Sequence, residues 1–590
     1  MINAPIFMHP AAVFFAGAFL MPFFKKNNFI KPALVIIPLI AIFQINFLPS
    51  SFGNVNYLGF ELIFGRLDSL SYVFLNVFTL MALIAGIYSS YLDEWEQHSA
   101  ALVYAGSSLG VTLAGDYLTL FIFWELMAFS SVFLVWYRKK RRSHKAGLRY
   151  LIVHATGGLV LLAGILIRYH YEGNFLFTPV PPESAGLGDY LIMVGFMLNA
   201  AVPPIHAWLP DAYPEASVIG AVYMCAYTTK TAVYTLARGF AGFEALVIFG
   251  AVMTLYGVGY AVIENDSRRI LAYHIVSQVG YMVCAVGIGT SMAINGACAH
   301  AYAHILYKAL LFMGVGAVVE MTGKSKLSEL GGMYSVMPVS LVMTVIGGIA
   351  ISGFPLTSGF ISKSMIVSAA GEAHRPFIMI MLLLASVGTF LSVGIKLPYF
   401  IWFNKTEPAV ADAKEAYSPM LGGMAIAAFF CIMMGVYPEY LYRMLPYEVH
   451  YHPYTMYHLS ETLQIIGFTG LGFYLMRKKL APEDKLNLDV DWFYRKAANP
   501  FKRFCGGPLS KLNDIAGEIY KTVGIKFTML FAKAMSWFDW NGIDYVIDSS
   551  AKETLNLGDK VKMLTTGKIQ QYIGIAVVIF FGVLIVVVLF

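Results

Sequence analysis

Apolar runs of about 20 residues, separated by short polar loops, make up most of the chain, and a run of this length can cross a bilayer as a helix. About 16 such runs are predicted, at residues 4–24, 30–48, 70–91, 100–115, 117–137, 148–168, 188–208, 216–239, 243–263, 269–290, 292–320, 335–369, 375–403, 418–438, 459–476 and 569–590. The predicted fold class is therefore an all-α polytopic membrane protein. Lys25 and Lys26 follow the first run and no basic region precedes it, so we expect a retained span and not a cleaved signal.

Three segments interrupt this pattern. Residues 51–68 alternate apolar and polar positions and contain turn residues, which predicts a small external hairpin. The runs 188–208 and 335–369 contain Pro203-Pro204 and Gly353-Phe354-Pro355, and proline breaks or kinks a helix. A break inside the membrane frees backbone groups, which can be satisfied where they line a hydrated cavity. The alternative is a simple packing kink.

Beyond residue 477 the chain becomes charged. Apolar positions there follow helical spacing with charged residues between them; they are Leu509, Leu512, Ile515, Ile519 and Val523. Residues 477–568 are therefore predicted to form an amphipathic helical region along the cytoplasmic membrane face or along neighbouring subunits. About fifty helical residues would extend about 75 Å, with an interruption at Asn541-Gly542. A soluble domain is the alternative, but the segment lacks the expected variety of strands and turns.

Composition and charge support the membrane assignment and orient the chain. It is 58% hydrophobic and 13% charged, against about 25% charged residues in a soluble domain. With about 16 spans and an outside N-terminus, all basic loops fall on one side, and the positive-inside rule makes that side the cytoplasm; these loops are 25–31, 138–149, 264–269, 322–327, 404–414 and 477–486. We expect a multi-pass protein of the inner (cytoplasmic) cell membrane, with both termini outside and the lateral helix on the cytoplasmic side. Because the basic residues cluster in these loops, the net charge of +6 does not imply a nucleic-acid partner.

The sequence contains no signature of a redox or nucleotide cofactor. Its five cysteines show no CxxC spacing, so neither a disulfide framework nor an iron–sulfur site is expected. Neither a Walker sequence nor a strand–GxGxxG–helix pattern is present. We therefore expect no cofactor and no metal in this chain, and another subunit must carry any electrons.

The strongest functional signal lies within the apolar run 292–320. His300, His304 and Lys308 recur every four residues, which places them on one face of a helix. Ionisable groups in a membrane helix normally face a protein interior or a water-filled cavity, and they mark an ion pathway. Three individually satisfied buried residues are the alternative, but the ordered spacing favours a pathway. A metal on the two histidines is not expected, because Lys308 adjoins them and no carboxylate is near.

Six motifs occur in a characteristic order. They are FWELM at 123–127, AAVPPIHAWLPDA at 200–212, TKTAVY at 229–234, DSRRILAYHIVSQVGY at 266–281, HAYAHILYKALLF at 300–312 and GFISK at 359–363. Together they resemble the antiporter-like membrane subunits of respiratory complex I (L, M and N types), Mrp cation/proton antiporters (D type) and membrane-bound hydrogenases. The resemblance covers about residues 55–440. The core is most similar to the D-type component of Mrp antiporters, whereas KMLTTGKIQQY at 562–572 resembles the end of the L-type component of complex I.

The resemblance implies a domain organisation with two inverted five-helix repeats, each containing one broken helix. The implied parts are N-terminal helices with the hairpin at 1–99, a first repeat at 100–240, a second repeat at 241–404, additional helices at 405–476, the lateral amphipathic region at 477–568 and a final membrane helix at 569–590.

The resemblance also implies a proton path along a buried axis, formed by Glu125, Lys230, His274, His300, His304, Lys308 and Lys363. Glu125 would couple one subunit to the next, the lysines would take up and release protons because burial shifts lysine pKa values readily, and Lys363 would be the terminal group. The alternatives are a protonated Glu125 packed against a polar neighbour and a structural, interfacial His274. Lys396 is predicted either to snorkel or to join the exit path.

One position departs from the family pattern. Asn199 stands where most members carry the lysine that partners the glutamate at 125, and an amide cannot titrate. We hypothesise that Lys230 takes over as the partner of Glu125. The alternative is that this half of the protein has lost its pump function.

The predicted function is proton translocation, with or without Na⁺ antiport, by a membrane subunit of a multisubunit energy-converting complex. The expected partners are other membrane subunits, including further antiporter-like ones, lipid, protons and Na⁺. The L-type tail favours an additional iron–sulfur or flavin module of the NADH:quinone oxidoreductase or hydrogenase kind, whereas the D-like core favours an antiporter. A non-conducting scaffold or lateral strap is the alternative, which Asn199 supports and the His300–Lys308 row opposes. An independent redox enzyme is not expected.

Overall fold

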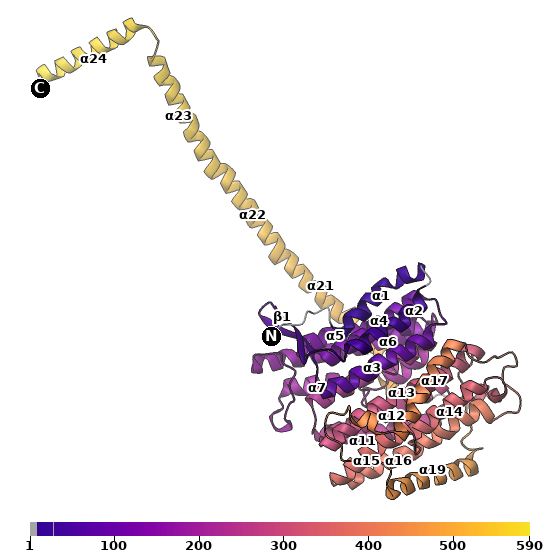
Figure 1. The fold of residues 1–590 in the computed structure, drawn as a ribbon. Coiled ribbons are helices and arrows are strands. Elements are labelled where there is room, and N and C mark those ends of the chain that lie inside the picture. Colours follow the sequence, from indigo (N-terminus) through magenta and orange to yellow (C-terminus); the bar gives the residue numbers. More distant parts are fainter. Residues whose placement is uncertain (1–8, 27–28, 486, 590) are drawn as a thin grey trace. The chain divides into compact units, whose positions relative to one another are not determined.

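The computed structural model describes residues 9–26, 29–485 and 487–589. The chain divides into two compact units, Met1–Asp491 and Trp492–Phe590. Helices dominate both units (Figure 1). Part of the first predicted run lies outside the described residues.

The helices of the first unit follow one another with short connections. Up to the middle of the chain they are α1 (Pro10–Lys26), α2 (Ile30–Gln44), α3 (Ser69–Ser89), α4 (Trp95–Leu113), α5 (Tyr117–Trp136), α6 (Arg141–Glu172), η2 (Pro182–Ser184), α7 (Leu187–Asn199), α8 (Trp208–Ala212), η3 (Tyr213–Glu215), α9 (Val218–Met224) and α10 (Thr228–Gly239). They continue as α11 (Glu244–Ile263), α12 (Ser267–Ile288), α13 (Ser291–Thr322), η4 (Leu327–Glu329), η5 (Met333–Ser335), α14 (Pro338–Ser352), α15 (Ser358–Glu372), α16 (Pro376–Thr389), η6 (Phe390–Lys396), η7 (Tyr399–Phe403), α17 (Ser418–Val436), α18 (Glu439–Tyr442) and α19 (Met456–Met476).

Nine helices of the described residues are long and apolar enough to cross a membrane: α3, α5, α6, α11, α12, α13, the helix Pro376–Phe403, α17 and α24. Shorter apolar helices are α1, α2, α7 and α14. This architecture is that of a multi-pass membrane protein. The count of about 16 spans stays a prediction, as does the division into inverted repeats.

The predicted hairpin is confirmed. Strands β1 (Ser51–Tyr57) and β2 (Phe60–Arg66) pair antiparallel through a two-residue turn. Asp116 ties this hairpin to the helices, because its carboxylate accepts hydrogen bonds from the backbone N–H of Ile63 (2.7 Å) and, as the N-cap of α5, from that of Thr119 (2.8 Å).

Both predicted helix breaks are confirmed, and the structure adds a third. Residues 200–207 separate α7 from α8, and residues 353–357 separate α14 from α15. The predicted run 216–239 is not continuous, because residues 225–227 interrupt it between α9 and α10. No proline or glycine marks this third break; instead Tyr104 Oη accepts a hydrogen bond from the first backbone N–H of α10 at 3.0 Å.

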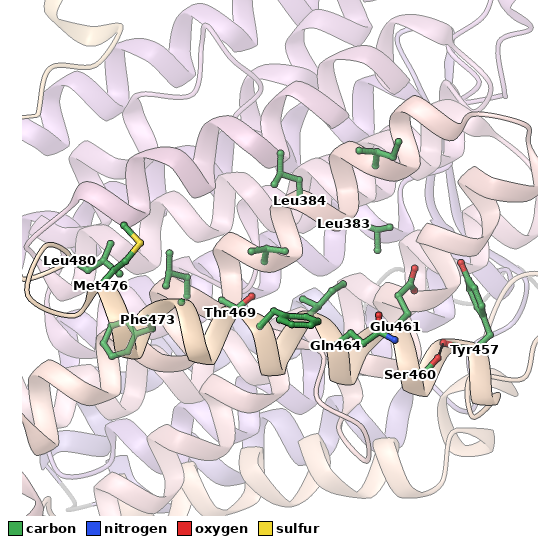
Figure 2. Close-up of a pocket in the computed structure, with 16 residues that line it drawn as sticks. Leu383, Leu384, Tyr457, Ser460, Glu461, Gln464, Thr469, Phe473, Met476 and Leu480 are labelled. Atoms are coloured by element: carbon green, nitrogen blue, oxygen red, sulfur yellow. Dashed lines mark hydrogen bonds between the residues drawn. The ribbon is translucent and has the colours of Figure 1, made fainter.

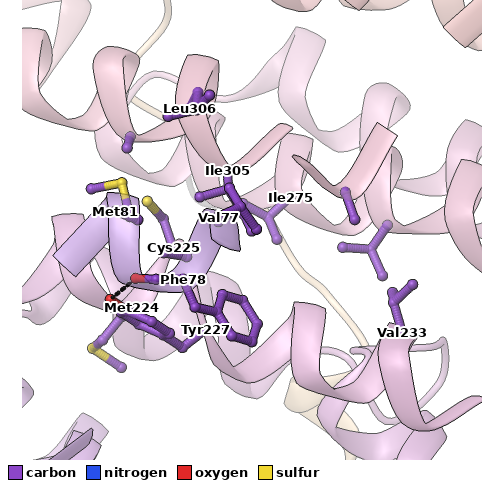
Figure 3. Close-up of a cluster of buried hydrophobic side chains, with 14 of the residues drawn as sticks. Val77, Phe78, Met81, Met224, Cys225, Tyr227, Val233, Ile275, Ile305 and Leu306 are labelled. Atoms are coloured by element: carbon purple, nitrogen blue, oxygen red, sulfur yellow. Dashed lines mark hydrogen bonds between the residues drawn. The ribbon is translucent and has the colours of Figure 1, made fainter. Parts of the chain in front are cut away.

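The long helix α13 lies at the centre of the first unit, where it packs against α3, α9, α12, α14, α15 and α17. Figure 3 shows the apolar cluster beside it, with Phe78 of α3, Ile275 of α12 and Ile305 of α13 near the α9–α10 interruption. Tyr227 closes this cluster by donating its hydroxyl to the carbonyl of Phe78 at 3.1 Å. The third break is thus held by packing and hydrogen bonds from neighbouring helices.

Helices α11 and α12 approach each other closely through glycines on both. A side chain at Gly257 would place its Cβ 2.5 Å from the backbone nitrogen of Ser277, and one at Gly280 would lie 2.7 Å from the carbonyl oxygen of Gly250. Gly250 itself faces the backbone of Cys284. Small residues allow such backbone contact between membrane helices, so this pair is held at a spacing that no larger residue permits.

The second unit is one extended helical segment followed by a separate helix. Its elements are α20 (Asp491–Phe504), η8 (Cys505–Leu509), α21 (Ser510–Ile519), η9 (Tyr520–Lys526), α22 (Phe527–Phe538), η10 (Asp539–Asp544), α23 (Tyr545–Leu564) and α24 (Ile569–Leu589). At 1.5 Å per residue, the segment from Asp491 to Leu564 extends about 110 Å, which exceeds the predicted length.

Two details of the predicted lateral region are corrected. Asn541-Gly542 does not interrupt the helix, because the chain continues through it as a π-helical turn, which inserts one extra residue without ending the helix. The predicted region begins at 477, but helix α20 begins only at Asp491. The apolar positions Leu509, Leu512, Ile515, Ile519 and Val523 are all exposed.

We expect Gly250→Ala to destabilise the protein, because its Cβ would overlap the backbone of α12. The cost should be about 1–3 kcal/mol, measured as a lower melting temperature of the detergent-solubilised protein. Gly259→Ala on the same helix is the control, because nothing lies within 4 Å of its Cβ position. An unchanged melting temperature for Gly250→Ala would contradict the close-contact interpretation.

Candidate functional site

The predicted row on α13 is fully buried. His300, His304 and Lys308 each have 0% exposure. His300 Nδ1 lies 3.1 Å from Ser362 Oγ, and His300 Nε2 lies 3.3 Å from the hydroxyl of Tyr307. Neither ring nitrogen of His304, nor Lys308 Nζ, has a hydrogen-bond partner among the residues that the structure describes. Buried polar groups without a protein partner are uncommon, and this row contains two such side chains, His304 and Lys308.

Lys230 lies at the third break. It is in the first turn of α10 and fully buried. Its ammonium group donates to the carbonyl oxygen of Cys225 at 2.6 Å and to Thr229 Oγ1 at 3.1 Å. Cys225 belongs to the interruption between α9 and α10, where carbonyls lack their usual helical partners. The break therefore supplies the acceptor that holds the lysine.

Lys363 is bound in the same way at another break. It lies on α15, and its ammonium group donates to the carbonyl oxygen of Ile351, in the last turn of α14, at 2.9 Å. The same group lies 5.3 Å from the centre of the Tyr281 ring, within the range of a cation–π contact. Two lysines on the predicted axis are thus each bound to a carbonyl next to a helix break.

No ion pair with a carboxylate involves Lys230, Lys308 or Lys363 in the described part of the chain. All three side chains are buried, with 0%, 0% and 5% exposure. A buried cation without a counter-ion is costly unless its charge can be neutralised. Lysine can be neutralised by releasing a proton, which arginine does not do in proteins.

Glu125 is not paired with Lys230 as we hypothesised. Among the described residues, no cation lies within 4 Å of its carboxylate, and its Oε1 is buried without a hydrogen-bond partner. The carboxylate instead lies against Gly158 of α6. One turn earlier on that helix, His154 Nδ1 lies 2.8 Å from Asn199 Oδ1.

His154 is a site residue that the sequence reasoning missed. Its position in the middle of the apolar run 148–168 is the sequence feature that could have identified it. In the structure its ring is buried between Tyr150 and Trp208. It provides a titratable group beside Asn199, at the position where the family pattern has a lysine.

His274 of α12 contacts the π-helical segment η6 that follows α16. His274 Nε2 lies 2.6 Å from Ser392 Oγ in η6. In the same π-helical segment, Lys396 donates to the carbonyl oxygens of Val262 (2.6 Å) and Glu264 (3.2 Å). Lys396 therefore does not snorkel to the surface; its ammonium group caps the end of α11.

Asp489 is a second residue that the sequence reasoning missed. It precedes α20, yet only 5% of it is exposed. Its carboxylate accepts hydrogen bonds from the hydroxyls of Tyr256 and Tyr273, the latter at 2.7 Å, and lies 3.3 Å from Nε2 of His206 in the first break. Burial alone would raise the pKa of the Asp489 carboxyl, but His206 and the two tyrosine hydroxyls outweigh this effect and hold the pKa well below its usual range.

No group of three or more His, Cys, Asp or Glu side chains in the described ranges could hold a metal ion. The ionisable side chains of the site are buried lysines and histidines together with the carboxylates of Glu125 and Asp489.

Comparison with known proteins indicates the class. Residues 114–392 match the family model described as NADH:quinone oxidoreductase/Mrp antiporter, TM. This segment contains all seven residues of the predicted axis, from Glu125 to Lys363. The predicted resemblance to the antiporter-like membrane subunits is therefore confirmed.

Curated relatives share 26–30% of aligned residues. An uncharacterized protein of Methanocaldococcus jannaschii is 27% identical over 70% of this chain and 90% of its own length. The A1 component of a Na⁺/H⁺ antiporter of Staphylococcus haemolyticus is 30% identical over 64% of this chain and 52% of its own. The A/B component of a probable K⁺/H⁺ antiporter of Rhizobium meliloti is 26% identical over 63% of this chain and 40% of its own length. The chain thus spans about half the length of the antiporter components that it matches.

Solved structures share the fold. A chain of the Mrp complex from Dietzia sp. has a TM-score of 0.67 at 19% identity, covering 79% of this chain and 98% of its own. A chain of an archaeal membrane-bound sulfane sulfur reductase has a TM-score of 0.65 at 21% sequence identity, and the match covers 78% of this chain and 98% of its own. A chain of Thermus thermophilus respiratory complex I has a TM-score of 0.63 at 19% sequence identity, and the match covers 73% of this chain and 97% of its own. The finer assignment to a D-type core with an L-type tail stays a prediction.

We expect Asp489→Asn to destabilise the protein by about 1–3 kcal/mol at pH 7, because charged hydrogen bonds are lost. The native carboxyl has a lowered pKa, so its stabilisation is present above the ordinary value of 3.8 and is lost as the pH falls through the lower folded value. The difference in melting temperature between variant and native protein should therefore be the same at pH 7 and pH 5 and narrow below about pH 4.

Asp484→Asn is the control for this prediction. Asp484 pairs with Lys326 at 2.8 Å, but 73% of its side chain is exposed, and exposed ion pairs contribute little. Equal melting temperatures for Asp489→Asn and native protein would show that the buried contacts do not stabilise the fold.

Proposed function

We propose that this chain is the proton-translocating subunit of a multisubunit membrane complex. The observation that supports this proposal most strongly is the set of three buried lysines without a carboxylate partner among the described residues, two of which bind carbonyls next to helix breaks. A lysine held in this way can alternate between its charged and neutral forms at modest cost, which is the property that a proton carrier needs.

The proposed path follows the axis from the first repeat to the second. A proton enters from the cytoplasm near the first break and reaches Lys230, then passes to Lys308 and through Lys363 to the opposite face. His300, His304 and His274 lie along this route. The unpartnered nitrogens of His304 and Lys308 are positions where bridging water would complete the chain of hydrogen bonds.

Coupling to a neighbouring subunit is assigned to Glu125. Its carboxylate lies in α5, partly buried and without a cationic partner among the described residues, so an approaching positive charge from another subunit would change its energy strongly. A change of charge at Glu125 would alter the proton affinity of the buried groups behind it. His154, rather than Lys230, is the proposed titratable neighbour in this half.

Two kinds of complex fit the chain. Relatives named as Na⁺/H⁺ antiporter subunits favour cation antiport, whereas the long helical segment Asp491–Leu564, with an exposed apolar face, favours a strap along adjacent membrane subunits. Copurification distinguishes them: iron–sulfur or flavin subunits indicate a redox-driven complex. A non-conducting scaffold is the second candidate function, supported by the amide at Asn199.

The first test is proton transport by liposomes containing the purified whole complex. We expect Lys308→Ala to lower the transport rate about 10-fold or more, because a proton carrier is removed. Lys414→Ala, an exposed loop lysine, is the control and should transport normally. If Lys308→Ala transports at the native rate in an intact complex, the scaffold is the better description.

The second test addresses the first half of the path. We expect His154→Gln to slow transport about 10-fold, because the amide of glutamine can still donate a hydrogen bond to Asn199 Oδ1 but cannot carry a proton. Asn199→Ala, which removes only the amide, should slow transport less. An equal, small effect of both variants would mean that His154 orients its neighbours and does not titrate during transport.

A further inference from the structure

A small cavity lies between Lys363 and a carboxylate on a helix outside the predicted repeats. This cavity has a volume of about 40 Å³ and is lined by Lys363 and Ser364 of α15, Ser386 of α16 and Glu461 and Thr462 of α19. A volume of this size holds at least one water molecule. Lys363 and Glu461 thus line a common space, although they are far apart in sequence.

Glu461 also borders a second, larger space. A groove of about 940 Å³ lies between α16 and α19, and Glu461 is part of its wall. Figure 2 shows the Glu461 side chain extending from α19 towards Leu383 of α16, beside Tyr457, Ser460 and Gln464. The polar residues of the groove are concentrated in the first turns of α19, and the later turns present mainly apolar residues such as Phe468 and Phe473. The carboxylate therefore stands at the boundary between the cavity of Lys363 and the polar end of the groove.

The position of Glu461 in the helix favours a role in transport over a structural one. It lies in the predicted span 459–476, and a carboxylate in such a segment is costly and usually functional. No lysine or arginine among the described residues lies within 4 Å of it. The polar end of α19 is opposite to the basic residues Arg477 to Lys479, which mark the predicted cytoplasmic face.

We propose that Glu461 is the proton acceptor that follows Lys363 and releases the proton on the side opposite to the basic loops. The ammonium group of Lys363 gives up one proton through water in the small cavity and becomes a neutral amine. The carboxylate of Glu461 takes up that proton and becomes a carboxylic acid, which then loses it to water at the polar end of the groove. This inference rests on the proposed function, because it needs Lys363 to carry protons.

The experiment compares variants of the whole complex in the same liposome transport assay. Glu461→Gln keeps the shape and removes the titratable group, and we expect transport to fall about 10-fold or more. Glu461→Asp retains a carboxylate and should transport within about threefold of the native rate. Glu372→Gln is the matched control. Glu372 is an exposed carboxylate at the last residue of α15, and it lines neither the small cavity nor the groove.

Lys308→Ala in the same assay separates the two proposals. If Lys308→Ala stops transport but Glu461→Gln transports at the native rate, the path exists and Glu461 is not its outlet. If neither variant affects transport, the proposed function itself is wrong. Equal losses in Glu461→Gln and Glu461→Asp, in complexes that copurify intact, would also overturn the proposal, because a carboxylate at this position would then not be sufficient.

Discussion

The organisation of the core depends on how a positive charge is held inside a membrane protein. A lysine in an apolar interior needs acceptors, and each carbonyl inside an unbroken helix already accepts a backbone hydrogen bond. In this chain the interruptions between α9 and α10 and between α14 and α15 release carbonyls, and Lys230 and Lys363 donate to them. The breaks, the buried lysines and the polar axis are thus parts of one arrangement.

The central helix α13 contains a buried lysine that has no such carbonyl acceptor among the described residues. Lys308 lies in the unbroken helix α13, and its ammonium group has no protein acceptor in the described part of the chain. A neutral amine tolerates this position better than an ammonium ion does. Lys308 therefore differs from Lys230 and Lys363, whose ammonium groups each donate to a protein carbonyl.

Much of this arrangement could be predicted from the sequence, because its signals are local. The row at His300, His304 and Lys308 follows from helical spacing, and the breaks at 203–204 and 353–355 follow from proline. The interruption at 225–227 could not be predicted, because it contains no proline or glycine and is held by Tyr104 and by Tyr227 from distant contacts. The roles of His154 and Asp489 could not be predicted for a similar reason. Each contacts a residue that is distant in the sequence, Asn199 for His154 and His206 for Asp489. The predicted pairing of Lys230 with Glu125 was wrong because the carbonyl of Cys225 binds the lysine instead.

The glycine contacts between α11 and α12 limit which movements can occur near His274. Helices that touch through their backbones cannot slide past each other without collision, so this pair moves as one rigid body. In the transport cycle that we propose, changes near His274 would then come from movement of side chains, and not from sliding of α12 along α11. Collective helix movements take microseconds to milliseconds, and local side-chain movements are faster. A rigid pair beside the axis would thus separate local proton transfer from any slower rearrangement elsewhere in the assembly.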